Sequence, residues 1–268
     1  MKNKIAALAL AAITLFAFSC GCTSQTPASN VSATTFTVGF DAAFPPYGYT
    51  NESGEYVGFD LDLAAEVCKR NGWELVKKPI EWDSKDFELT SGTIDCIWNG
   101  FTINGRESDY EWTKAYVDNS QVIVVSVDSG IAALSDLAGK TVLVQADSSA
   151  LAALTDTENQ ENVALAASFK SLTQVPDYLT AFLTLESGAA DAIAMDIGVA
   201  EYEIAERNGS YTILSEPIAS EQYGIGFKLG NAVLRDKVQA TIDEMAADGT
   251  FLAIAEKWGL EEAVCIGK

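Results

Sequence analysis

The chain has 268 residues, and its 38 acidic against 17 basic side chains give a formal net charge of −21. Such an acidic protein repels phosphate backbones and anionic lipid headgroups, so we expect no nucleic-acid partner. The sequence contains no histidine. A Ser-His or Cys-His catalytic pair is therefore excluded.

The N-terminal residues predict a leader for export. Lys2 and Lys4 precede an apolar stretch over residues 5–18, which is too short for a comfortable transmembrane span. We therefore predict a signal peptide over residues 1–19 and an extracytoplasmic protein.

Two cysteines, Cys20 and Cys22, follow this apolar stretch and precede a polar Ser/Thr/Pro segment. Small residues before a cysteine resemble the lipobox of a bacterial lipoprotein. The resemblance implies a lipid on Cys20, with Cys22 as the alternative, and a flexible tether over residues 20–34. The lipid would then hold the protein at the membrane. A plain secretory signal with an incidental cysteine is the other interpretation.

The three remaining cysteines, Cys68, Cys96 and Cys265, match no metal-binding spacing. We therefore predict no metal site. Buried free thiols at Cys68 and Cys96 are the favoured interpretation, and a disulfide between them is the alternative.

Beyond the tether, strand-like and helix-like segments alternate along the chain. Apolar residues at helical spacing over 60–71 end at Gly72, and a β-branched run over 121–127 has high strand propensity. We predict strands over 36–40, 73–76, 94–98, 121–127, 140–145, 190–195, 211–214 and 224–228. We predict helices over 60–71, 83–91, 148–154, 178–186, 197–207, 232–247 and 251–258, with a helical turn over 134–137 and a short element after Ser168.

This alternation predicts an α/β architecture. Two similar series of helices and strands suggest two lobes. The final strand and the two helices after it could belong to either lobe on this pattern alone.

Arg106 is the most informative of the four arginines. Arg70, Arg207 and Arg235 fall on predicted polar helix faces, whereas Arg106 closes a loop of small polar residues after the strand 94–98. A guanidinium beside free backbone N–H groups suits bidentate binding of a carboxylate. An ordinary surface arginine is the alternative.

A set of short motifs occurs in a fixed order from residue 36 onward. They are Gly39 to Tyr47, Gly54 to Ala64, Gly92 to Cys96, Thr102 to Arg106, Leu137 to Gln145, Ser187 to Asp196, Gly224 to Phe227, Ala247 to Phe251 and Lys257 to Gly259. Together they resemble the polar amino-acid-binding components of bacterial ABC importers, solute-binding family 3.

This resemblance implies an α/β, two-lobed periplasmic-binding-protein fold of type II, with two crossover hinge strands and a ligand cleft between the lobes. Lobe one would cover 35–118 plus 219–268, and lobe two 119–218. The protein would be a monomer that binds an extracellular amino acid, closes, and delivers it to a membrane permease. It would need no cofactor and catalyse no reaction.

The resemblance also implies a site for a zwitterion. The residues for the ligand carboxylate are Arg106, the backbone of Thr102, Ser148 and Ser149. Those for the ammonium are Asp196, the Gly100 carbonyl and the Thr102 hydroxyl. Those for the ligand side chain are Asp41, Phe44, Trp82 and Asn99, which suits basic, amide or sulphur-containing amino acids better than acidic ones.

Several of these residues also have a structural interpretation. Ser148 and Asp196 could be helix N-caps, Asp41 a turn residue, and Phe44 and Trp82 parts of the lobe-one core. A ligand-binding sensory module and a cyclohexadienyl-dehydratase-like enzyme on the same fold are the alternative functions.

The chain departs from the family pattern at two places. Asp147 stands where relatives usually carry glycine, and we expect a carboxylate there to be unfavourable unless it points away. Thr102 and Arg106 are separated by three residues where relatives have four, and we expect Gly105 to permit the tighter turn.

Overall fold

The structure is a computed structural model, and it describes residues 34–267. The predicted signal peptide, Cys20, Cys22 and residues 20–33 of the tether lie outside the described residues. Thr34, which we predicted as the last tether residue, instead begins the first strand. Among the helices that the structure describes, none is long and apolar enough to cross a membrane.

Strands and helices alternate as the sequence pattern predicts. The strands are β1 (Thr34–Phe40), β2 (Ala43–Phe44), β3 (Gly48–Thr50), β4 (Tyr56–Val57), β5 (Trp73–Pro79), β6 (Cys96–Thr102), β7 (Glu111–Trp112), β8 (Val117–Ser126), β9 (Thr141–Gln145), β10 (Ser171–Val175), β11 (Ala192–Asp196), β12 (Tyr211–Ile213) and β13 (Ala219–Phe227). The α-helices are α1 (Phe59–Asn71), α2 (Lys85–Ser91), α3 (Ser149–Thr155), α4 (Gln160–Ser168), α5 (Tyr178–Glu186), α6 (Ile197–Glu206), α7 (Ala232–Ala247) and α8 (Thr250–Trp258). Short 3-10 helices cover Trp82–Ser84 (η1) and Leu134–Leu137 (η2).

One mixed sheet of ten strands organises the described residues. Its main path runs β10-β9-β11-β8-β13-β6-β1-β5, with β12 paired to β8 and β7 paired to β13. The runs β10-β9-β11 and β6-β1-β5 are parallel, whereas β8 and β13 are antiparallel to each other. The parallel runs explain the strand–helix alternation, because parallel neighbours need a crossover connection.

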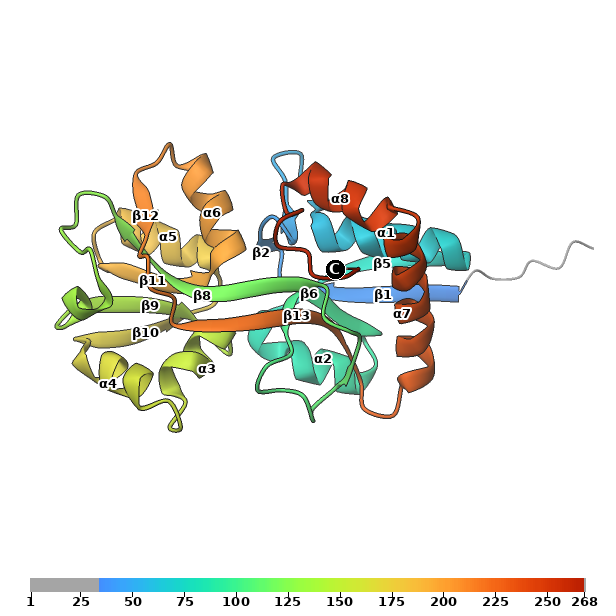
Figure 1. The fold of residues 1–268 in the computed structure, drawn as a ribbon, viewed down its shortest axis with the longest axis horizontal. Coiled ribbons are helices and arrows are strands. Elements are labelled where there is room, and N and C mark those ends of the chain that lie inside the picture. The colour runs from blue at the N-terminus through green and yellow to red at the C-terminus, as the bar shows by residue number, and fades with distance from the viewer. Residues whose placement is uncertain (1–33, 268) are drawn as a thin grey trace, which may run out of the picture. The chain divides into compact units, whose positions relative to one another are not determined.

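Figure 1 shows the elements in two groups that the long strands β8 and β13 connect. Helices α1, α2, α7 and α8 surround β1, β5 and β6, and we call this group lobe one. Helices α3 to α6 surround β9 to β12, and we call this group lobe two. Alternating residues of β8, β9 and β11 belong to two different hydrophobic clusters. Both faces of the lobe-two sheet are therefore buried, as is usual for sheets that helices cover on both sides.

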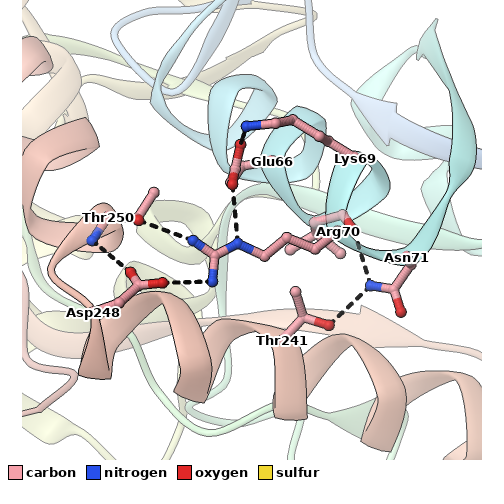
Figure 2. A network of polar contacts seen from close by, with 8 residues as sticks. Glu66, Lys69, Arg70, Asn71, Thr241, Asp248 and Thr250 are labelled. Atoms are coloured by element: carbon pink, nitrogen blue, oxygen red, sulfur yellow. Dashed lines mark hydrogen bonds and ion pairs between the residues drawn. The ribbon is translucent and has the colours of Figure 1, made fainter.

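The C-terminal helices pack on lobe one. Figure 2 shows the Arg70 guanidinium, at the end of α1, bonded to Asp248 at 2.8 Å and to Thr250 at 2.9 Å in the α7–α8 junction. The neighbouring Asn71 amide donates to the Thr241 hydroxyl of α7 at 2.8 Å. These contacts place α7 and α8 against α1. The sequence periodicity had left open the lobe to which these C-terminal helices belong. The residue bounds predicted for the two lobes stay a prediction, and they fall within β8 and at the start of β13.

The sequence pattern missed the end of one strand, one helix, and the short strands β2, β3, β4 and β7. The strand predicted over 94–98 is β6, which runs to Thr102, so Asn99 and Gly100 are strand residues rather than loop residues. Tertiary pairing is the reason, because this end of β6 pairs with β13. Helix α4 was not predicted as a helix. Its one buried residue is the polar Asn162, and a search for apolar residues at helical spacing does not reveal such a helix.

The buried cysteines carry free thiols. Cys68 and Cys96 are both buried and unbridged, which confirms the favoured interpretation. Burial raises the pKa of the Cys68 thiol to about 11, so the thiol is protonated and unreactive at neutral pH.

Candidate functional site

Arg106 follows β6 after a tight turn. Its backbone N–H donates to the carbonyl of Ile103 at 2.9 Å, and Gly105 within the turn has a φ of 79°. Glycine adopts this left-handed conformation without the steric penalty of a Cβ. The short spacing between Thr102 and Arg106 is thus accommodated at Gly105, as we expected.

The Arg106 guanidinium contacts both lobes. Its Nη1 donates to the Ser149 hydroxyl of lobe two at 2.9 Å and lies 3.4 Å from the Thr102 carbonyl oxygen of lobe one. Its Nη2 lies 3.4 Å from the Asp147 carbonyl oxygen. The guanidinium carbon is 5.4 Å from the centroid of the Phe101 ring, a distance at which the ring attracts the cation.

Arg106 differs from the other arginines in its partners. Arg70, Arg207 and Arg235 each form ion pairs with carboxylates. The hydrogen bonds of Arg106 within residues 34–267 go to neutral oxygens. Its positive charge is therefore available to an anionic ligand.

The part of lobe two that faces Arg106 is the start of α3. Ser148 is the N-cap, and its Oγ accepts from the Leu151 backbone N–H at 3.2 Å, which confirms the capping interpretation. Ser149 directs its hydroxyl to Arg106 instead. The structure thus brings Arg106 to Ser149, while the Ser148 hydroxyl is used by the cap.

Asp147 lies next to this helix start and has a φ of 55°, a conformation that favours glycine. Its carboxylate forms an ion pair with Lys85, the first residue of α2 in lobe one. The negative charge that we expected to be unfavourable near a carboxylate-binding site therefore has a counter-ion from the opposite lobe.

Asp196 ends β11 and occupies the N-cap position of α6, but its side chain makes no capping bond, so that interpretation of the side chain is wrong. Its Oδ1 accepts from the Tyr223 hydroxyl and the Gln121 amide, each at 2.6 Å, and from the Asn119 amide at 2.9 Å. Its Oδ2 accepts from the Tyr178 hydroxyl at 3.1 Å. Burial raises the pKa of Asp196, and these donors offset part of that increase.

Glu221 is a second buried carboxylate beside Asp196. Its Oε1 accepts from the amides of Asn119 and Gln121, each at 2.8 Å, and from the Thr102 hydroxyl at 2.7 Å. Burial and the neighbouring Asp196 charge raise the pKa of Glu221 to about 7. Two carboxylates that share two amide donors make this region attractive to a cation.

Three side-chain atoms here are buried without a partner among the described residues. They are the carbonyl oxygens of Asn119 and Gln121 and the amide nitrogen of Asn99. Buried polar groups are normally hydrogen-bonded, so these atoms suit donors and acceptors from a ligand.

Asp41 follows β1 and is 6% exposed. Its Oδ1 accepts from the Ala43 N–H at 2.8 Å, which confirms the turn interpretation, and its own N–H donates to the Asn99 side chain at 2.7 Å. Its Oδ2 accepts from the Gln145 amide of lobe two at 2.7 Å. Burial raises the pKa of Asp41 to about 6, and the charges of Asp177 and Glu81 add to this effect.

The predicted aromatic residues are in different clusters. The Phe44 ring packs 5.7 Å from Tyr47 and 5.9 Å from Tyr178 of lobe two, whereas Trp82 packs edge-on against Phe101 at 5.5 Å. Both belong to hydrophobic clusters, in line with the core interpretation. A shared sandwich around a ligand stem stays a prediction.

Gly100 lies against the Phe44 ring. It has a φ of 56°, and a Cβ at this position would lie 2.8 Å from the Phe44 ring. Its N–H donates to Asp60 at 2.6 Å. A larger residue would therefore be strained both by its backbone conformation and by the ring.

Two cavities lie beside these residues. One of about 390 Å³ is lined from both lobes, by residues that include Lys85, Arg106 and Ser148. The other, of about 470 Å³, is lined by Asp41, Trp82 and Asp177 among others. Both have volumes typical of small-molecule sites.

Sequence reasoning missed five polar residues of this region: Lys85, Asn119, Gln121, Gln145 and Glu221. Two signals could have found some of them. Asn119 and Gln121 are two residues apart on one strand, which places both side chains on one face. A lysine in the first turn of a helix opposes the helix dipole, which hints at a distant partner for Lys85.

The fold and these residues together define a protein that holds a small solute between two lobes. Residues 36–261 match the bacterial extracellular solute-binding proteins, family 3, and the chain belongs to this family. The expected two-lobed periplasmic-binding-protein fold of type II is confirmed by its structural neighbours.

Some similar proteins are named for an amino acid or were solved with one bound. The L-cystine-binding protein TcyJ of Escherichia coli (strain K12) is 29% identical over 227 residues, which are 84% of this chain and 82% of TcyJ. A substrate-binding protein of an ABC uptake transporter from Streptococcus pneumoniae, solved with bound histidine, has a TM-score of 0.80 and 31% identity, and the match covers 86% of this chain and 94% of that one. An ancestral arginine-binding protein bound to arginine has a TM-score of 0.75 and 36% identity, with 84% and 97% coverage.

Proposed function

We propose that the protein binds one amino acid between its two lobes and delivers it to the permease of an ABC importer. The observation that carries this proposal is the Arg106 guanidinium, which contacts both lobes and has no carboxylate partner among the described residues. A ligand α-carboxylate would accept from this guanidinium and from the Ser149 hydroxyl.

The ligand ammonium would bind beside Asp196 and Glu221. These carboxylates concentrate negative charge near Arg106, since the Thr102 hydroxyl bonds to Glu221 while the Thr102 carbonyl approaches Arg106. The ammonium could also donate to the unpartnered oxygens of Asn119 and Gln121. A cation at one end and two carboxylates at the other would orient a zwitterion.

The ligand side chain would point to Asp41 and Asn99, with Phe44 and Trp82 as apolar neighbours. The negative charges of Asp177 and Glu81 lie near Asp41, so a basic or neutral polar side chain fits better than an acidic one. The relatives named for cystine, histidine and arginine are consistent with this class.

Delivery would depend on lobe closure without any covalent change in the ligand. The hinge would lie in the long strands β8 and β13. Lobe one would then cover 35–118 plus 219–268, and lobe two 119–218. Hinge closure around a ligand is the usual motion of such two-lobed proteins. The protein would act as a monomer.

The membrane attachment is a separate part of the proposal. A lipid on Cys20, or alternatively on Cys22, would hold the binding protein near the permease. Cys20→Ser should release the protein from the membrane fraction if Cys20 is the anchor, and Cys22→Ser should leave it bound.

Calorimetric titration with the twenty amino acids, cystine and ornithine tests the binding function. One amino acid or a few should bind, and mass spectrometry should recover the ligand unchanged. Arg106→Ala should weaken binding at least about 100-fold, because it removes the charge-assisted hydrogen bonds to the carboxylate. Arg235→Ala, which removes an arginine that pairs with Asp236 and Glu111, is the control and should bind normally. Binding by no amino acid, or normal binding by Arg106→Ala, would contradict the proposal.

A further inference from the structure

Lys85 is an unusual cation in this protein. Among residues 34–267 it is the only lysine or arginine whose side chain is buried, with 1% exposed. It begins α2, where the helix dipole opposes a positive charge. Burying an ammonium is unfavourable unless a partner compensates it. Asp86 of the same helix contributes to this compensation, and the larger contribution comes from outside the helix.

The partner of Lys85 comes from lobe two. Its Nζ forms an ion pair with the Asp147 carboxylate and lies 3.5 Å from both the Asp147 and the Trp82 carbonyl oxygens. It is also 5.1 Å from the centroid of the Trp82 ring. Asp147 supplies this contact from a left-handed backbone conformation.

Arg106 reaches the same point of lobe two, because its Nη2 lies 3.4 Å from the same Asp147 carbonyl oxygen. Two cations and the Asp147 carboxylate therefore meet where the lobes touch, and the charge of Asp86 also acts on Lys85. A ligand carboxylate bound by Arg106 would add a negative charge opposite that guanidinium. Without Lys85, the Asp147 carboxylate would instead repel the ligand carboxylate.

We propose that Lys85 is a positioning residue for the ligand-carboxylate site of Arg106 and Ser149. Lys85 neutralises Asp147 and holds residues 147–149 of lobe two beside Arg106 when the lobes close. The effect on ligand affinity rests on the proposed function. The ion pair between the lobes is a separate claim, which can be tested before the ligand is identified.

A double-mutant cycle tests the effect on affinity. Lys85→Met should weaken binding of the amino acid found by calorimetry about 10-fold or more, because it leaves Asp147 uncompensated. Asp147→Asn keeps the shape of the side chain while removing its charge, and asparagine tolerates the left-handed backbone conformation at this position. In the Asp147→Asn background, Lys85→Met should change affinity by less than about threefold. An equal loss in both backgrounds would overturn the proposal in favour of a direct ligand contact or a purely structural role, and no loss in either would also overturn it.

Lys114 and Asp243 provide a matched control pair. Their Nζ–Oδ2 distance is 2.9 Å, both lie in lobe one, and their side chains are 67% and 45% exposed. Lys114→Met, Asp243→Asn and the double variant should leave affinity unchanged, and thermal unfolding of every variant reports whether it is folded.

A cross-linking experiment does not require the ligand to be identified and can be run with and without added amino acids. A carbodiimide activates a carboxylate, and an adjacent amine then displaces the resulting urea to form an amide. Mass spectrometry should find a Lys85–Asp147 amide in the native protein and not in Asp147→Asn. Its absence both with and without an amino acid would overturn the ion pair. Failure of every amino acid to bind would contradict the proposed function but leave this result to decide the pairing.

Discussion

The Gln145 side chain at the end of β9 donates a hydrogen bond to the buried Asp41 carboxylate at the end of β1, with 2.7 Å between Nε2 and Oδ2. The bond joins lobe two to lobe one, and both residues stand where a parallel strand ends. Ligands of open α/β sheets bind at this edge. The Asp41–Gln145 contact is therefore both a contact between the lobes and a neighbour of the proposed side-chain pocket.

Removing this bond should weaken ligand binding. Gln145→Leu deletes the donor and leaves the buried Asp41 carboxylate with one fewer hydrogen bond in the closed form. Because hydrogen bonds to charged groups contribute about 1.5–3 kcal/mol, calorimetry should show affinity at least roughly 10-fold lower. Gln174→Leu, an exposed position on β10, is the matched control and should bind normally. Equal affinities for the two variants would argue against the role of this contact.

Asp41 should make folding stability depend on pH. Burial raises its pKa from the ordinary 3.8 to about 6, so the folded protein holds this proton more tightly than the unfolded chain. The resulting stabilisation is fully present below pH 3.8 and is lost as the pH rises through about 6. Urea unfolding should show the stability of the native protein relative to Asp41→Asn falling by on the order of 3 kcal/mol between about pH 4 and pH 7.

Asp248 serves as a control of opposite sign. Hydrogen bonds from Arg70 and Thr250 lower the pKa of Asp248, so its contribution is present above the ordinary value of 3.8 and is lost as the pH falls. The stability of the native protein relative to Asp248→Asn should therefore rise with pH in the acid range. A pH-independent difference for Asp41→Asn would refute the prediction for Asp41.

Asp196→Asn should abolish high-affinity binding. The substitution keeps the size of the side chain but removes the charge proposed to face the ligand ammonium, so we expect a loss of at least about 100-fold by calorimetry. Glu201→Gln removes a carboxylate from the exposed face of α6 and is the control. Affinity within about threefold of native for Asp196→Asn would show that the ammonium binds elsewhere.

Arg70→Ala should lower stability without affecting the ligand. Its guanidinium connects α1 to the α7–α8 junction through Asp248 and Thr250 (Figure 2), and neither residue is a hydrogen-bond partner of Arg106. The urea midpoint should fall while calorimetric affinity stays native. Lys69→Ala is the comparison, since that side chain is 76% exposed and pairs with Glu66, and such surface pairs contribute little. An unchanged midpoint for Arg70→Ala would mean that the tail docks through its apolar contacts alone.

Much of the fold could be predicted from local patterns. Helix α1 has apolar residues at helical spacing and a glycine stop, and both signals lie within a short stretch of chain. The end of β6 escaped prediction because small polar residues there become strand only by pairing with β13. The capping role of Ser148 was readable from its position before a helix. The same reasoning failed for Asp196, because buried donors from other strands and helices occupy its carboxylate and it makes no capping bond.

The sequence by itself determined the α/β class and the family resemblance, and it singled out Arg106 as the candidate anion-binding cation, because these depend on composition, periodicity and the order of motifs. Only the tertiary structure decided what surrounds that cation. Lys85 and Asp147 are 62 residues apart, and Asp41 and Gln145 are 104 apart. No local pattern links such pairs. Their charges and hydrogen bonds meet because two lobes bring distant strand and helix ends together.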